Sequence, residues 1–131
     1  MSLSTIISNL TIAAIAFLAP IQAAMIAVGL LIAIDTIFGI IAAVKSREQI
    51  QSRKFARVLI KLLAYQLLIV SAHLAQSFLS PLIPFVNITL VYVAISEFMS
   101  IGENFSKITG SNFIKYLKDI LNKYLNKAKE V

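Results

Sequence analysis

The stretch from Ile21 to Val44, IQAAMIAVGLLIAIDTIFGIIAAV, contains a single charged residue, Asp35. A helix needs about 20 predominantly apolar residues to cross the hydrocarbon core of a bilayer. The Ile, Leu, Val and Phe residues of this stretch contribute roughly −4 to −7 kcal/mol to insertion, against about +2.5 to +3.5 kcal/mol for one acid. The sequence therefore predicts a transmembrane helix over residues 21–44.

Two further apolar runs have the same character. Residues 58–80 and 85–106 are each long enough to span a membrane, and they are separated by the uncharged turn Ser-Pro-Leu-Ile-Pro. The run 3–19 is shorter and contains Ser, Thr and Asn, so we expect either a fourth span or a helix in the membrane interface. The expected fold is an all-α integral membrane protein with three or four transmembrane helices.

The composition agrees with this fold class. Hydrophobic residues make up 59% of the 131 residues and charged residues 14%, whereas soluble domains have roughly 45–50% and about 25%. A soluble chain of this size could not bury so much apolar surface, and a bilayer would solvate it instead.

The basic residues indicate how the chain is oriented. All 12 Lys and Arg residues fall within 45–61 and 107–129. The positive-inside rule therefore places the loop 45–57 and the tail 107–131 in the cytoplasm. Long gaps between basic clusters are typical of membrane topology and not of a nucleic-acid-binding face, so we expect no nucleic-acid partner. The residues assigned to topology and to contact with the anionic inner leaflet are Lys45, Arg47, Arg53, Lys54, Arg57, Lys61, Lys107, Lys115, Lys118, Lys123 and Lys127.

These features divide the chain into three parts. Residues 1–20 form a membrane-associated or spanning helix, 21–106 the transmembrane core, and 107–131 a basic amphipathic tail helix. The apolar residues of the tail recur at i, i+3, i+4 and i+7, with the lysines opposite. This pattern predicts a helix on the inner leaflet, and a coiled coil between subunits is the alternative.

Ionisable residues inside the apolar runs are the candidate functional residues. Asp35, His73 and Glu97 each lie about 14–18 Å from the predicted cytoplasmic end of their helix, at 1.5 Å per residue. We therefore expect them in one polar layer, where they either hold the helices together or face water in an assembled state. The layer and the polar stripes around it comprise Asp35, His73, Glu97, Gln66, Ser100 and Asn104. Small residues for close helix packing are Gly39, Ala42, Ala43 and Gly102.

No enzymatic constellation is recognisable. The chain has no Cys and one His, and it contains no Gly-rich phosphate loop. We therefore predict no catalytic residues, no metal site, no cofactor and no enzymatic activity.

Two segments resemble a known family. The run from Ile34 to Lys45 matches the D-x-x-x-G-x-x-A-A segment of the phage lysis and toxin-secretion holins, and the run from Ile95 to Asn104 is similar to their E-x-x-S-I-x-E-N segment. A basic loop lies between the two segments and a short basic tail follows them, as in that family. The loop differs in having Phe55-Ala56 where a glycine often stands.

The resemblance implies a function. Such holins form homo-oligomers in the bacterial inner membrane and open lesions that collapse the membrane potential and release an endolysin, sometimes under the control of an antiholin. Two other classes stay open on the residues alone. A small ion or solute channel or transporter subunit would use Asp35, His73 and Glu97 as a relay, and a membrane anchor would present the tail helix to a partner.

Overall fold

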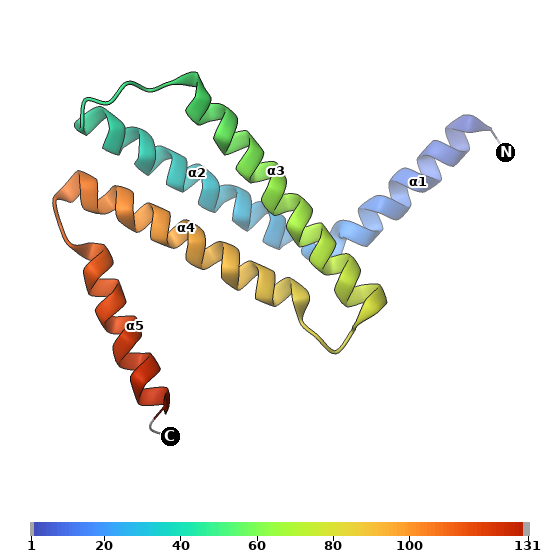
Figure 1. Ribbon diagram of the computed structural model, residues 1–131. Coiled ribbons are helices and arrows are strands. Elements are labelled where there is room, and N and C mark those ends of the chain that lie inside the picture. Colours follow the sequence, from blue (N-terminus) through green and yellow to red (C-terminus); the bar gives the residue numbers. More distant parts are fainter. Residues whose placement is uncertain (1, 130–131) are drawn as a thin grey trace.

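The computed structural model describes residues 2–129, and this part of the chain is helical without a β-strand (Figure 1). Three long helices, α2 (Gln22–Lys45), α3 (Ser52–Leu74) and α4 (Phe85–Thr109), lie side by side, with α2 packed against both others. Helices α1 (Leu3–Leu18) and α5 (Phe113–Lys129) diverge from opposite ends of this bundle. The protein is an all-α membrane protein.

Three helical segments are long and apolar enough to cross a membrane: Leu3–Lys45, Ser52–Leu79 and Phe85–Thr109. Helices α2 and α4 begin within a residue of the expected spans. Helix α3 begins at Ser52, six residues before the predicted start at residue 58. The basic residues there mark the end of the apolar run and not the end of the helix, since Lys and Arg are good helix formers.

A bend at Pro20 separates α1 from α2. The chain forms a short 3-10 turn at Ala19–Ile21, because proline lacks a backbone N–H and its ring clashes with the carbonyl of the preceding turn. Every described side chain of α1 before Phe17 is exposed. Helix α1 therefore meets the bundle only at its C-terminal end (Figure 1).

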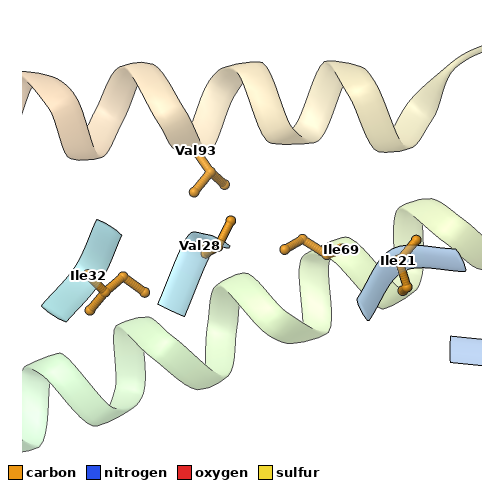
Figure 2. Close-up of a cluster of buried hydrophobic side chains, with 5 residues drawn as sticks. All are labelled: Ile21, Val28, Ile32, Ile69 and Val93. Carbon is orange, nitrogen blue, oxygen red and sulfur yellow. The ribbon is translucent and has the colours of Figure 1, made fainter. Parts of the chain in front are cut away.

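The core of the bundle is small. Figure 2 shows its five buried members, Ile21, Val28, Ile32, Ile69 and Val93, which come from all three long helices and the turn before α2. The outer faces carry large exposed apolar side chains, such as Leu30 (60% exposed) and Leu63 (62% exposed). Surface of this kind needs a bilayer around it.

The connection between α3 and α4 contains a π-helical turn, Ala75–Leu79. There the Ser80 amide donates to the Ala75 carbonyl at 2.9 Å, the i→i+5 bond of a π-turn. The Gln76 side-chain oxygen accepts a hydrogen bond from the Val86 amide at 3.1 Å. It therefore caps one of the free N–H groups at the start of α4.

Helix α5 is docked against the end of α4. The chain reverses at Gly110, whose φ of 70° lies in the left-handed region that glycine tolerates. Gly102 on α4 is buried, and a Cβ there would lie 2.9 Å from Ile114 Cδ1 and 3.2 Å from Phe113 Cδ1. The absence of a side chain at residue 102 therefore allows the first turn of α5 to contact α4.

Candidate functional site

An ion cluster joins the three long helices. The Lys61 ammonium on α3 lies 3.0 Å from Asp35 Oδ2 on α2 and 2.7 Å from Glu97 Oε2 on α4. The side chains of Lys61, Asp35 and Glu97 are 29%, 13% and 0% exposed. One cation therefore serves two carboxylates, in a region where an unpaired charge would be strongly disfavoured.

Neighbouring side chains extend this cluster. Asn104 on α4 donates a hydrogen bond from Nδ2 to Asp35 Oδ1 at 3.2 Å. A Cβ at Gly39, one turn after Asp35, would lie 3.5 Å from Asn104 Nδ2, so a small residue leaves room for the amide. One turn after Lys61, the Tyr65 hydroxyl is 3.3 Å from Ser96 Oγ. These contacts fix the rotation of α2, α3 and α4 relative to one another.

Within the described part of the chain, two buried oxygen atoms lack any polar partner, and a third, Glu97 Oε2, has only its ion-pair contact with the Lys61 ammonium at 2.7 Å. Glu97 Oε1 and Gln66 Oε1 have no hydrogen-bond partner among residues 2–129, although the Gln66 amide nitrogen donates to the Met25 carbonyl at 3.0 Å. A buried acceptor without a donor costs about 1–3 kcal/mol. A rearrangement that brings a hydrogen-bond donor to Glu97 Oε1 or Gln66 Oε1 would therefore be favourable.

A cavity of about 240 Å³ adjoins the cluster. It lies between the C-terminal half of α2, the loop 46–51, the start of α3 and the end of α4. Asp35, Thr36 and Asn104 line its inner part, and Lys54 and Lys107 lie where the helices meet the loop. Ala42 and Ala43, which were predicted to pack helices closely, form part of its wall.

His73 is not part of the cluster, which corrects the predicted three-residue layer. Its Nε2 donates to the Phe17 carbonyl at 2.9 Å, and its ring centroid lies 4.5 Å from that of Phe17. Lys61 and His73 are twelve residues apart on α3, or about 18 Å along the helix. The prediction measured the depth of His73 from Lys61 as if Lys61 lay at the membrane surface, whereas α3 begins at Ser52.

Lys61 itself has a different position from the one predicted. The sequence interpretation assigned it to the inner leaflet together with the other basic residues, but its ammonium points between the helices and pairs with the two acids. A signal for this role was present. Lys61 is the only Lys or Arg within the predicted spans, and acids inside a membrane usually pair with a base.

The remaining predicted residues are dispersed. Ser100 is half-buried on α4, and Gly102 contacts α5 and not another long helix. The Lys45 ammonium donates to the Ile108 carbonyl near the C-terminus of α4, where a cation is favoured by the helix dipole. Lys54 pairs with Glu48 at 3.5 Å. The other predicted topology residues are exposed: Arg47, Arg53, Arg57, Lys107, Lys115, Lys118, Lys123 and Lys127.

Within residues 2–129, no three His, Asp or Glu side chains lie close enough together to hold a metal ion. The site is instead a charged and hydrogen-bonded contact between helices. It can hold the bundle in one arrangement, and it can present polar groups to water if the helices separate.

Comparison with known proteins gives one match. A family model described as the bacteriophage holin family matches residues 12–126, which include all three long helices and most of α5. No curated protein and no solved structure shows significant similarity to the chain.

Proposed function

Because the chain belongs to the bacteriophage holin family, we propose that it assembles with further copies of itself in the bacterial inner membrane and opens non-selective lesions. An endolysin, or a secreted protein in a secretion locus, would leave the cytoplasm through them in a timed lysis event. The observation that carries this proposal is the Asp35–Lys61–Glu97 cluster. It holds together a bundle whose apolar core is small.

The cluster suggests two states for the polar side chains. In a single molecule, Lys61 pairs with both Asp35 and Glu97 between the helices, and the three charged groups together carry one net negative charge. In a larger ring, the same side chains would turn toward a water-filled lesion, where each charge is solvated and needs no partner. Assembly would therefore exchange ion pairs for hydration, at little cost in apolar packing.

The oxygen atoms without a hydrogen-bond partner also favour the change from the single molecule to the assembled ring. Glu97 Oε1 and Gln66 Oε1 lack donors in the single molecule. Water or a neighbouring copy would supply these donors. Each new hydrogen bond recovers part of the roughly 1–3 kcal/mol lost by an unsatisfied buried group.

The orientation follows from the basic residues. We place the segment 45–57 and helix α5 in the cytoplasm, because the segment carries five Lys or Arg residues against one Glu and helix α5 carries exposed lysines. On α5 the lysines would contact anionic headgroups of the inner leaflet, at about 1 kcal/mol per residue near the surface. The partners in function are an endolysin and, where one is encoded, an antiholin that delays assembly.

The alternative of a selective channel is less well supported. Its relay would run through Asp35, His73 and Glu97, yet His73 lies about 18 Å along α3 from Lys61 and is bonded to the Phe17 carbonyl. A relay over this distance would have to cross the apolar core formed by Ile32, Ile69 and Val93.

The experiment that tests the proposal is induced expression in bacterial cells. Membrane potential and culture density are followed with and without a co-expressed cytoplasmic endolysin that lacks a secretion signal. We expect sudden depolarisation after a fixed delay, followed by lysis only when the endolysin is present. Growth that continues with an intact potential, or a pH-dependent ion flux without killing, would contradict the proposal.

A further inference from the structure

We propose that the cavity beside Asp35 is a water-filled vestibule through which small water-soluble molecules reach the ion cluster from one face of the membrane only. The face is the one that carries the loop 46–51. The inference rests on the three long helices crossing a bilayer and does not require that the protein forms lesions.

The size and the lining of the cavity favour water. A space of about 10–15 Å³ holds one water molecule when two to four polar groups line it, and this cavity measures about 240 Å³. Polar and charged residues line it alongside small and apolar ones: the polar group includes Asp35, Thr36, Asn104, Glu48, Lys54 and Lys107, and the apolar group includes Ile40, Ala43 and Val58. A cavity with this lining holds several water molecules, whereas an apolar cavity of the same size would stay dry.

The charges at the wall are balanced. Lys54 pairs with Glu48 at 3.5 Å, and Lys107 of α4 and Asp35 of α2 also line the cavity. A space lined by both signs does not exclude a solute because of its charge. The vestibule should therefore admit small solutes according to size.

Water and small solutes in the vestibule can travel no further than the ion cluster, because apolar side chains close the bundle beyond it. Ile32, one turn before Asp35 on α2, is 2% exposed, and Ile69 and Val93 are 0% exposed. In Figure 2, the Val93 and Ile69 side chains point toward Val28 of α2, and Ile32 lies further along α2 in the same cluster. Glu97, on the α4 side of the same layer, is 0% exposed. Water that enters at the loop 46–51 therefore meets an apolar seal before it reaches the opposite face.

The test uses the absence of Cys from the sequence, which makes single-cysteine variants unambiguous. Thr36→Cys places a thiol on the cavity wall, about 14 Å from the end of α2. Ile37→Cys is the matched control, since Ile37 lies at the same depth, is 55% exposed and does not line the cavity. Ile32→Cys reports on the seal, and Ala42→Cys is a second position on the cavity wall.

The reagent is a membrane-impermeant trimethylammonium methanethiosulfonate, which is applied to right-side-out and inside-out membrane vesicles that retain a trapped dye. Gln49→Cys in the loop and Leu82→Cys in the turn between α3 and α4 identify the two faces. A thiol reacts as the thiolate, which requires water. We expect Thr36→Cys and Ala42→Cys to react from the face of Gln49→Cys on the order of tenfold faster than Ile37→Cys or Ile32→Cys.

Three results would overturn the vestibule: no reaction at both cavity positions, equal reaction from both faces, or equal rates at Thr36→Cys and Ile37→Cys. The first of these would mean that lipid or protein fills the space. Lysis assays are independent of this outcome. A protein that is labelled from one face but never releases endolysin supports the vestibule and contradicts the proposed lesion. A protein that releases endolysin but is not labelled from one face supports the lesion and contradicts the vestibule.

Discussion

The ammonium of Lys61 lies 2.7 Å from a carboxylate oxygen of Glu97, a side chain with no exposed surface. The same ammonium contacts Asp35 at 3.0 Å, so removal of one side chain leaves two acids without a cation. One lysine therefore contacts acids on both neighbouring helices, and its contribution can be tested directly.

Replacement of the shared cation should destabilise the bundle. Lys61→Met leaves Asp35 and Glu97 buried and unpaired, and we expect a loss of about 3–5 kcal/mol in the free energy of unfolding. Helix unfolding in mixed micelles, followed by circular dichroism, measures this loss. The control Lys54→Met removes the exposed pair with Glu48 and should change stability by less than about 1 kcal/mol. Equal effects of the two variants would mean that the cluster contributes no more to the free energy of unfolding than an exposed ion pair does.

Neutralisation of both acids should change the timing of lysis. In Asp35→Asn/Glu97→Gln the amides leave the Lys61 charge unpaired, so the single-molecule arrangement is less favourable and depolarisation should begin earlier. The delay between induction and depolarisation is the measured quantity. Glu103→Gln, which removes an exposed acid on α4, should leave the delay unchanged. Unchanged timing, assembly and permeability in the double variant would refute the proposed role of the acids.

A side chain at residue 102 should release α5 from α4. Gly102→Val places atoms against Ile114 and Phe113, where even a Cβ would lie 2.9 Å from Ile114 Cδ1. We expect a cost of about 1–3 kcal/mol from overpacking and faster proteolysis in the linker around Gly110. Gly29→Ala is the control, since its Cβ would lie 4.0 Å from Leu62 Cδ1. Protection of the linker in Gly102→Val would show that this contact does not hold α5.

Loss of the His73 imidazole should loosen α1. His73→Ala removes both the hydrogen bond to the Phe17 carbonyl and the ring contact with Phe17. Spin labels on α1 and α3 should then give a broader distance distribution than in the parent protein. Leu74→Ala changes the next residue, which is 45% exposed, and should leave the distribution unchanged. An unaltered distribution in His73→Ala would show that Pro20 alone sets the position of α1.

The sequence predicts the helical segments well because span length and hydropathy are local properties. The runs 21–44 and 85–106 correspond to α2 and α4 within a few residues. The contacts between helices depend on how each helix is rotated about its axis. Because these helices are apolar on every side, their sequence pattern does not determine that rotation. For this reason the sequence identified Asp35 and Glu97 as candidates but did not identify Lys61 as their partner. It also placed His73 in their layer, whereas the structure has His73 bonded to Phe17 at another level of the bundle.

The bend at Pro20 also determines how much membrane area one molecule occupies. Straight, the 43 residues from Leu3 to Lys45 would form a helix of about 65 Å, roughly twice the thickness of the hydrocarbon core. The bend leaves α2 at about 36 Å, close to membrane length, and turns α1, about 24 Å long, away from the bundle. If α1 lies in the plane of the membrane, each molecule sweeps a wider area than its three packed helices cover. Neighbouring molecules then begin to collide at a lower surface density, which lowers the copy number at which the membrane becomes crowded.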